Sequence, residues 1–335
     1  MNLDNYRIIV TGGYGFIGSN FVKLILSKGA SVLNLDALTY AANLNNIDLD
    51  GSNGKYEFIK CDISSSPLDH IFHDFQPDAI VHFAAESHVD NSIKDASRFI
   101  ETNINGTYNL LKAAHNFLTR RLNYKRFRLI HISTDEVFGD LPLDSKKSFN
   151  EESQIRPSSP YSASKASSDH LVSAWRRTYN LPAVILNCSN NFGPRQNNEK
   201  FIPMLINNAL NAEKVKVYGS GQNIRDWLFV EDFIDAICLV LATERTCDRY
   251  LIGANNEMSN INLAMYILER VKILTGLDYI SSELVQYAPE RKGHDLKYSV
   301  DSRKFKNDFN WKPRWKFENA IDKTINWYLE KSGSS

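Results

Sequence analysis

Residues 7–18 read RIIVTGGYGFIG, an apolar, β-branched run that ends in a turn with four glycines. The run predicts a buried first strand over Arg7–Thr11, and the apolar spacing of Phe21, Leu24 and Ile25 predicts that a helix follows directly. Glycines in such a turn let the backbone approach a ligand closely, and the free N–H groups of the new helix can bind a pyrophosphate. A glycine-rich turn by itself is a weak signal, because an ordinary loop has the same composition.

A second predicted strand, Ser31–Asp36, ends in an acid about 20 residues after the glycines, where a carboxylate can bind the diol of a ribose. The charge of Asp36 would repel a 2′-phosphate, and Ala37 and Leu38 offer no arginine to bind one. We therefore expect the cofactor to be NAD rather than NADP.

Strands and helices continue to alternate, with a strand at Tyr56–Lys60, a helix near Leu68–Phe75 and a strand at Ala79–Phe83. This order predicts an α/β fold with a Rossmann-type, doubly wound parallel sheet. After the strand Ala183–Cys188 the alternation becomes irregular, which indicates a smaller, irregular α/β substrate domain towards the C-terminus. We predict an NAD-binding domain over residues 1–190, rejoined by about 228–250, and a substrate domain over residues 191–227 and 251–330.

The composition limits the classes of partner. Lys+Arg and Asp+Glu are equal at 39 each, so the net charge favours neither nucleic acid nor an anionic membrane. The four cysteines have no paired or metal-like spacing, and no apolar run approaches the roughly 20 residues that span a bilayer. We expect a cytoplasmic protein with reduced thiols. We expect no metal, because no second histidine or cysteine stands at ligand spacing from His88.

The strongest candidate for chemistry is the stretch Ser133–Gly139, which follows the short apolar strand Phe127–Ile132. The loop opened by Thr134 would leave the carboxyl end of that strand, where open α/β sheets bind ligands. Asp135 and Glu136 place two carboxylates there.

Tyr161 and Lys165 open another predicted helix and lie one turn apart on the same face. They would add two proton-transfer groups to the threonine and the two carboxylates. A long helix is expected over roughly 96–121, and Thr102 lies in a small, polar face within it. Apolar stripes on the Thr102 and Tyr161 helices predict either core packing or the seam of a homodimer.

Taken together, these motifs resemble the extended short-chain dehydrogenase/reductase family over nearly the whole chain. Within it the chain is similar to the 4,6-dehydratases of nucleoside-diphosphate-glucose, dTDP-glucose above all. The Thr134-Asp135-Glu136 sequence is the most specific sign, because sugar-nucleotide epimerases of the family generally lack the acidic pair. The resemblance also runs through the segments 11–18, 36–40, 84–90, 159–165, 188–194, 199–200, 225–227 and 293–295.

The resemblance implies three sets of site residues. The catalytic residues would be Thr134, Asp135, Glu136, Tyr161 and Lys165. The NAD site would comprise Gly12, Gly15, Phe16, Ile17, Gly18, Asp36, Thr39, Asp62, Ile63, Ala84, Ala85, Thr102, Tyr161, Lys165 and Asn191. For Asp62, a role as a turn or N-cap residue is equally consistent with the sequence. The sugar-nucleotide site would comprise Ser87, Thr134, Asn190, Lys200, Tyr218, Arg225, Asn260, Arg291 and His294.

The implied activity is a lyase reaction, in which NAD-dependent oxidation at C4, elimination across C5 and C6, and reduction at C6 give a 4-keto-6-deoxy sugar nucleotide plus water. Tyr161, its pKa lowered by Lys165 and the nicotinamide charge, would take the 4-hydroxyl proton, Glu136 the C5 proton, and Asp135 would protonate the leaving hydroxyl. Arg195, Asn197-Asn198 and Lys292 depart from the common pattern, so the substrate could also be UDP-glucose or another nucleotide sugar. The motifs are also compatible with a sugar-nucleotide 4-epimerase, and the fold with a non-catalytic NAD-binding regulator.

Overall fold

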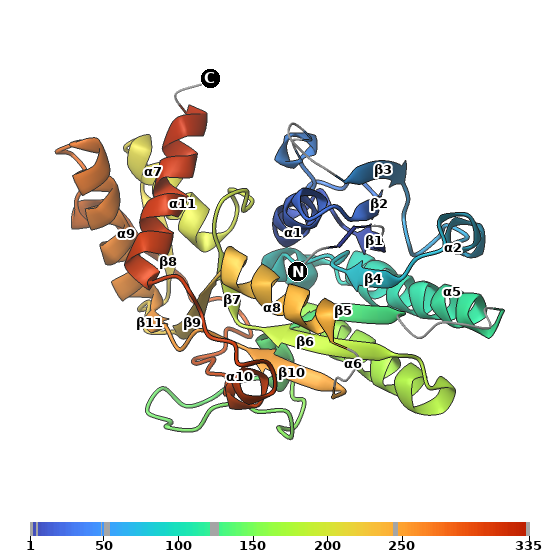
Figure 1. The fold of residues 1–335 in the computed structure, drawn as a ribbon. Helices are drawn as coiled ribbons and strands as arrows, with labels where there is room; N and C mark the ends of the chain where they lie inside the picture. The colour runs from blue at the N-terminus through green and yellow to red at the C-terminus, as the bar shows by residue number, and fades with distance from the viewer. Residues whose placement is uncertain are drawn as a thin grey trace.

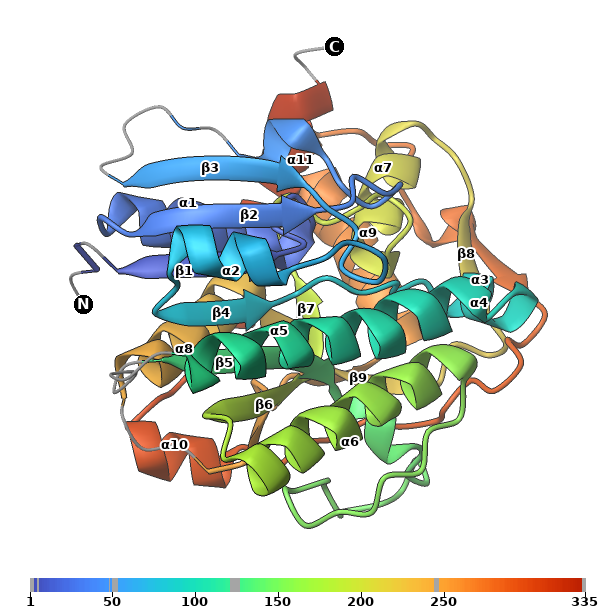
Figure 2. The ribbon, with the colours of Figure 1, turned by 90° about the vertical axis from the view of Figure 1, so that its right-hand side faces the viewer.

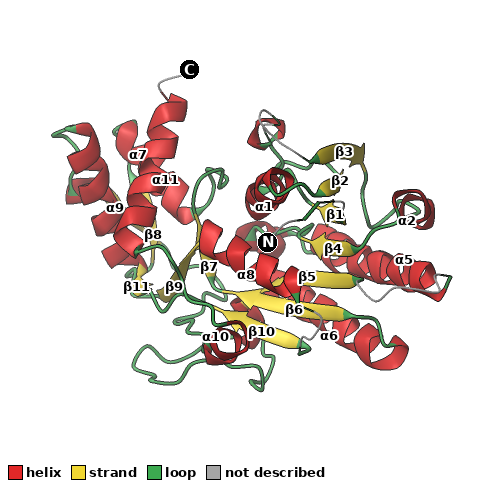
Figure 3. Ribbon diagram, in the orientation of Figure 1, coloured by secondary structure: helices red, strands yellow, loops and turns green. Residues whose placement is uncertain are grey.

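The computed structural model describes residues 3–4, 6–47, 49, 54–120, 127–243 and 247–332. Its centre is a seven-stranded sheet in which every neighbouring pair of strands is parallel. In spatial order the strands are β10 (Arg249–Ile252), β6 (Ala183–Cys188), β5 (Arg128–Thr134), β4 (Ala79–His82), β1 (Arg7–Thr11), β2 (Ser31–Asp36) and β3 (Lys55–Lys60). The predicted doubly wound α/β fold is confirmed (Figure 3).

Helices cover both faces of this sheet. Side chains of β1 point alternately to the two faces, so they enter two different cores. Ile8 and Val10 pack with the helix α1 (Phe16–Ser27) and with α8 (Val230–Ala242). Ile9, between them, packs on the opposite face with α2 (Asp69–Phe75), α5 (Thr107–Thr119) and α6 (Pro160–Tyr179). Figure 2 shows these last three helices side by side in front of the sheet.

The second half of the chain adds two small sheets beyond the carboxyl ends of the main strands (Figure 1). One has the order β11 (Glu257–Ser259), β9 (Ile224–Phe229) and β7 (Asn190–Phe192), and the other pairs β12 (Val285–Ala288) with β8 (Val215–Tyr218). The helices α7 (Phe201–Leu210), α9 (Asn260–Thr275) and α11 (Phe317–Ser332) pack together beside them. Shorter helices are η1 (Leu44–Asn46), α3 (Val89–Lys94), η3 (Asp135–Phe138), η4 (Ser282–Leu284) and α10 (Arg303–Phe309).

The chain returns from this part to the main sheet through α8 and β10, and β10 pairs with β6 at the edge of the sheet. The predicted division into domains stays a prediction. Within the described ranges, no helix is both long and apolar enough to cross a membrane.

The helix expected over 96–121 is interrupted. It consists of α4 (Ser97–Phe99), a π-helical segment η2 (Ile100–Gly106) and α5, and residue 121 lies outside the described residues. At Gly106 an added Cβ would lie 2.8 Å from Cγ1 of Ile63, so the helix approaches the loop after β3 more closely than another residue would allow. The sequence signalled the close packing through this glycine but not the change of helical type.

Candidate active site

The glycine turn lies directly beneath the loop that follows β4. Gly12 has φ +71°, and a Cβ there would lie 2.8 Å from the backbone nitrogen of Ala84. At Gly18 a Cβ would lie 2.3 Å from the carbonyl oxygen of Gly12. Both positions therefore need glycine, because backbone atoms pack where a side chain would begin. The turn leads directly into α1, whose free N–H groups can bind a dinucleotide phosphate.

A cavity of about 320 Å³ opens over this turn. It brings together nearly all of the residues that we predicted for NAD. Those that line it are Gly12, Gly15, Phe16, Ile17, Gly18, Asp36, Thr39, Ala84, Ala85, Thr102, Tyr161, Lys165 and Asn191. The residues present therefore fit the cofactor, although their individual roles stay predictions.

Asp36 is held at the end of β2 by two backbone groups. Its Oδ2 accepts a hydrogen bond from the N–H of Tyr14 and its Oδ1 accepts one from the N–H of Leu38, both at 2.9 Å. Each carboxylate oxygen has a second lone pair, so Asp36 can still accept hydrogen bonds from a ribose diol.

Asp62 and Ile63 are not among the residues that line this cavity. Oδ1 of Asp62 instead accepts hydrogen bonds from the N–H and the hydroxyl of Ser64, at 2.9 Å and 2.7 Å. Ile63 is 3% exposed and packs against Gly106. This geometry favours the turn-residue interpretation of Asp62 over contact with the cofactor.

A second cavity, of about 270 Å³, lies between the loop after β4 and the small sheets. It is lined by every predicted sugar-nucleotide residue except Thr134, which lines the first cavity. These residues are Ser87, Asn190, Lys200, Tyr218, Arg225, Asn260, Arg291 and His294. Glu136 lines both cavities, so the acidic pair lies where the two cavities meet.

The acidic pair sits on a short helical turn, η3, immediately after β5. The hydroxyl of Thr134 caps this turn by accepting a hydrogen bond from the N–H of Glu136 at 3.2 Å. The same hydroxyl lies 3.2 Å from Oδ1 of Asp135, while Oδ2 of Asp135 is buried with no hydrogen-bond partner among the described residues.

The pKa values of Asp135 and Glu136 differ because the two carboxyl groups have different surroundings. Burial raises the pKa of Asp135 well above its usual value, and the charges of Glu136 and Asp226 raise it further. Burial also raises the pKa of Glu136, but the cations Arg225 and Lys200 oppose the rise. Arg225 also opposes the rise at Asp135, but the pKa of Asp135 is raised more than that of Glu136, which suits Asp135 to act as the acid and Glu136 as the base.

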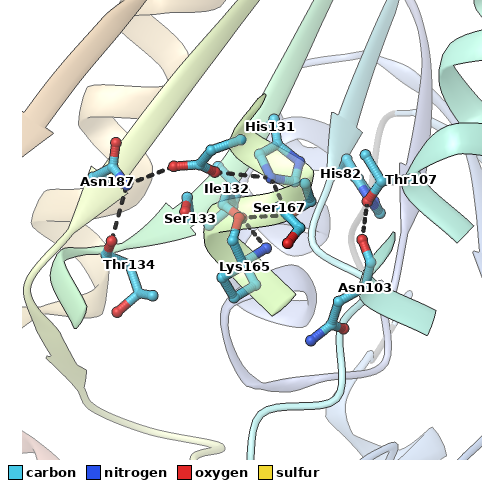
Figure 4. Close-up of polar contacts among 12 residues, drawn as sticks. His82, Asn103, Thr107, His131, Ile132, Ser133, Thr134, Lys165, Ser167 and Asn187 are labelled. Carbon is cyan, nitrogen blue, oxygen red and sulfur yellow. Dashed lines mark hydrogen bonds and ion pairs between the residues drawn. The ribbon is translucent and has the colours of Figure 1, made fainter. Parts of the chain in front are cut away.

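Tyr161 and Lys165 face the first cavity from the start of α6. This helix begins with a capping box between Ser159 and Ser162 and has Pro160 at its first position, so its first turn is well defined. Nζ of Lys165 donates a hydrogen bond to the carbonyl oxygen of Ile132 at 2.8 Å (Figure 4). Burial lowers the pKa of Lys165 to about 8.

One expectation about Tyr161 requires correction. Burial raises the pKa of Tyr161 well above its usual value, and the charges of Glu136, Cys188 and Asp135 add to the rise, while a hydrogen bond with Thr134 opposes it. The protein's own groups therefore work against the lowered pKa that we expected. Any net lowering depends on the positive charge that a bound nicotinamide would add beside the hydroxyl.

Three of the cations that line the second cavity, Arg225, Lys200 and Arg291, have different partners. Arg225 is 6% exposed, donates to the carbonyl oxygens of Ile224 and Asp295 at 2.8 Å, and lies 4.1 Å from the ring centroid of Tyr298. A guanidinium has five N–H donors, so these bonds leave donors for a ligand. Lys200 donates to the carbonyl oxygen of Ser87 at 2.9 Å.

Arg291 is paired with Asp90, a residue that our sequence analysis did not assign. Nε of Arg291 lies 2.7 Å from Oδ1 of Asp90, and the hydroxyl of Tyr218 donates to Oδ2 of the same carboxylate at 3.2 Å. A ligand phosphate at Arg291 would have to share or displace this carboxylate. Asp90 could have been suspected from its place at the end of the motif 84–90.

Arg195, one of the departures from the common pattern, points away from the second cavity. It donates to the carbonyl oxygen of Asn46 at 3.1 Å and to Oδ1 of Asn20 at 2.9 Å, so it ties the loop after β7 to α1. Its presence therefore carries no information about the nucleotide base. Among the described residues, no group of three His, Cys, Asp or Glu is placed to hold a metal ion.

The parallel sheet, the glycine turn and the Tyr161–Lys165 pair in one cavity define a short-chain dehydrogenase/reductase of the extended, sugar-nucleotide-modifying type. The chain belongs to the NAD-dependent epimerase/dehydratase family. Residues 9–324 match the family described as GDP-mannose 4,6 dehydratase. The predicted family membership is confirmed.

Similar proteins narrow the comparison further. The chain is 46% identical to a dTDP-glucose 4,6-dehydratase of Haemophilus influenzae, over 98% of this chain and 99% of that protein. The crystal structure of a dTDP-glucose 4,6-dehydratase from Bacillus anthracis in complex with NAD is 39% identical, with a TM-score of 0.84 and 98% of each chain covered. A Thermus thermophilus UDP-glucose 4-epimerase in complex with NAD has the same TM-score, 0.84, but is 28% identical, with 96% of this chain and 99% of that chain covered. Fold alone therefore does not separate dehydratase from epimerase.

We predict that the protein binds NAD far better than NADP and that Asp36→Ala narrows this preference by about 10-fold or more, the usual effect of losing a charged hydrogen-bond partner. Isothermal titration calorimetry with both nucleotides measures it. Asp62→Ala is the matched control, because it removes a carboxylate that lies outside the cavity. Equal binding of NAD and NADP by the unmodified protein would show that Asp36 is wrongly placed.

Proposed function

We propose that the protein catalyses the NAD-dependent dehydration of dTDP-glucose to the 4-keto-6-deoxy sugar nucleotide and water. The observation that carries this proposal is the position of Asp135 and Glu136, between a cofactor cavity with Tyr161 and Lys165 and a second cavity rich in cations. The dTDP-glucose dehydratases at 46% and 39% identity support the same reaction, and the predictions of function and cofactor are confirmed to that extent.

When bound, NAD accepts the hydride from C4 of the sugar and later returns it to C6. Tyr161 acts as tyrosinate, which the positive charge of Lys165 stabilises, and becomes neutral tyrosine when it takes the proton of the 4-hydroxyl. The 4-ketone makes the C5 hydrogen acidic, so Glu136 removes this proton and gives a proton back to C5 when the hydride reaches C6. Asp135, whose pKa is raised by burial, donates a proton to the 6-hydroxyl as it leaves as water.

Two competing functions are weaker. A 4-epimerase needs Tyr161 and Lys165 but has no use for an acid and a base, Asp135 and Glu136, beside them. A non-catalytic NAD-binding regulator has no use for any of the four groups. Turnover of dTDP-glucose and UDP-glucose in parallel, with detection of a 4-keto product, discriminates among these functions and shows which nucleotide is accepted.

The assignments of Glu136, Asp135 and Tyr161 predict where the reaction stops in each variant. Glu136→Gln should still permit oxidation at C4, so enzyme-bound NADH accumulates, while exchange of the C5 proton slows by about 10²–10⁴-fold. Tyr161→Phe should suppress NADH formation itself, and Asp135→Asn should slow only the elimination. Single-turnover absorbance of the nicotinamide and C5 solvent-deuterium exchange measure these steps.

The control for this series is Glu231→Gln, a partly exposed carboxylate on α8 that pairs with Lys323. It should leave both steps unchanged. Loss of NADH formation in Glu136→Gln, with NAD and substrate still bound, would remove Glu136 from the elimination step.

We place the diphosphate of the substrate beside Arg225, Arg291 and Lys200, because the second cavity collects these cations. Arg225→Ala should weaken binding of dTDP by about 2–4 kcal/mol while NAD binding barely changes. Calorimetry with dTDP measures this, and Arg270→Ala, which removes a bidentate surface pair with Asp322, is the matched control. An Arg225→Ala protein that folds and binds dTDP normally would show that Arg225 has only a structural role.

A homodimer through α5 and α6 is a further part of the proposal. Their outer faces carry Tyr108 and Tyr179, which are 41% and 47% exposed. Tyr108 and Tyr179 each pack against Trp175, so they form a continuous apolar surface. Pairing of this surface with a second copy would give a four-helix seam.

Light scattering at micromolar concentration should give twice the mass of one chain, and Tyr108→Lys combined with Tyr179→Lys should shift it towards the monomer. Tyr279→Lys, at a tyrosine that is 45% exposed and lies after α9, should not. A monomeric unmodified protein would contradict the dimer.

We also propose the predicted domain division, residues 1–190 with about 228–250 and residues 191–227 with 251–330, because the second cavity lies between these two parts. A cytoplasmic location is proposed because the four cysteines are free thiols.

A further inference from the structure

A buried carboxylate lies beneath the catalytic groups and takes no direct part in the reaction described above. Asp169 is on α6, one turn after Lys165, and is 0% exposed. Its Oδ2 accepts a hydrogen bond from Nδ2 of Asn187 at 3.1 Å and lies 3.3 Å from a guanidinium nitrogen of Arg249. Its Oδ1 lies 3.4 Å from Nε2 of His131. A fully buried carboxylate needs such compensation, because desolvation of a charge is costly.

Asn187 connects this carboxylate to the catalytic turn. The same Nδ2 that binds Asp169 also donates to the carbonyl oxygen of Thr134 at 2.9 Å (Figure 4). That carbonyl belongs to the peptide that joins Thr134 to Asp135, so its direction fixes where η3 begins. Parallel pairing of Ser133 with Asn187 brings the two groups into register.

Asp169 also places a negative charge near Lys165, because it follows Lys165 by four residues on α6, lies on the same face of the helix and is buried with it. The ammonium group of Lys165 donates to a neutral carbonyl, that of Ile132, and burial lowers the pKa of Lys165, whereas the charge of Asp169 raises it. His131 adds no charge near neutral pH, because burial lowers its pKa to about 4. Arg249 is the other permanent charge at Asp169.

We infer that Asp169 is a positioning residue for both halves of the reaction: it provides the buried counter-charge of Lys165, and through Asn187 it holds the turn that carries Asp135 and Glu136. The inference rests on the proposed function for its kinetic part only. It predicts that the two contributions separate, since Asp169→Asn removes the charge but keeps an oxygen that can accept from Asn187, whereas Asn187→Ala keeps the charge but releases the turn.

The effect of the Asp169 charge on Lys165 can be measured without turnover. The titration of Lys165 is followed by NMR in protein with 13C-labelled lysine ε-carbons, and the signal is assigned with Lys165→Gln. In Asp169→Asn the midpoint should fall by about one pH unit or more, the usual effect of losing an opposite charge nearby. In Asn187→Ala and in the surface control Asp69→Asn it should stay within about 0.3 unit, well below the shift expected for a lost charge. An unchanged midpoint in Asp169→Asn would overturn the inference.

The neighbours of Lys165 on every adjoining element are accounted for in this expectation. They are Tyr161 and Asp169 on α6, His131 on β5, Cys188 on β6, His82 on β4 and, beyond Asp169, Arg249 on β10. Asp169 is the only one of these described groups that is a carboxylate with a lowered pKa, so its charge persists throughout the titration.

The role of Asn187 in holding η3 is measured by single turnover of dTDP-glucose in the holoenzyme. In Asn187→Ala, elimination should slow by about 10²-fold, the cost of a small misplacement of catalytic groups, and bound NADH should accumulate because C4 oxidation continues. In Asp169→Asn, the rate of NADH formation should instead begin to fall at a lower pH on the alkaline side of its profile, because Lys165 loses its proton at a lower pH. Asn187→Ser, which keeps one donor, should restore part of the elimination rate.

The matched control is the surface pair of Asn116 and Asp69, in which Nδ2 of Asn116 donates to Asp69 at 2.9 Å. Asn116→Ala should leave both steps unchanged. Equal slowing of oxidation and elimination in Asn187→Ala, without NADH accumulation, would show that Asn187 contributes only to stability. Failure of the unmodified protein to convert dTDP-glucose would count against the proposed function, while the lysine titration would still decide the inference.

Discussion

The parallel alignment of β4, β5 and β6 is the constraint on which the site depends. The register pairs His82 with His131 and Thr134 with Cys188, so the three strands end at one edge of the sheet. The loops that leave this edge must then share one small volume. The cofactor cavity, the acidic turn and the start of α6 are neighbours for this reason, although the sequence separates them by many residues.

This shared volume explains why burial dominates the electrostatics of the site. Asp135, Tyr161 and Lys165 are all buried, and for each of them burial is the largest influence on the pKa. In such surroundings small differences in partners are amplified, because opposing charges are not screened by water. Arg225 and Lys200 act on Glu136, whereas the charges that act on Tyr161 are those of acidic groups, and this contrast gives the two residues different protonation behaviour.

The main sheet and most of the site could be predicted because the sequence signals for them lie within short segments of the chain. Strand bounds at Arg7–Thr11 and Ser31–Asp36 follow from apolar runs bounded by glycine and acid, and the structure reproduces both. Asp90 and the network of Asp169 escaped prediction because their partners, Arg291 and Asn187, are brought to them by tertiary packing. The sequence also contained no sign of the burial that raises the pKa of Tyr161, because it shows which charges are near but not how completely water is removed.

The π-helical segment η2 also constrains which changes of chain length the fold can accept. Such a segment contains more residues per turn than an α-helix, so deleting one residue would let α4 and α5 join as a regular helix. The residues within η2, however, would be redistributed around the helix axis, because a π-helical turn holds more residues than an α-helical turn. Thr102 would leave the cofactor cavity, and Asn103 would lose its hydrogen bonds to the backbone N–H and carbonyl oxygen of Glu86 and to Ser164. A shorter helix would therefore be locally more regular and yet unable to hold the loop that borders the cofactor cavity, so this irregular turn should resist deletion during evolution more strongly than substitution.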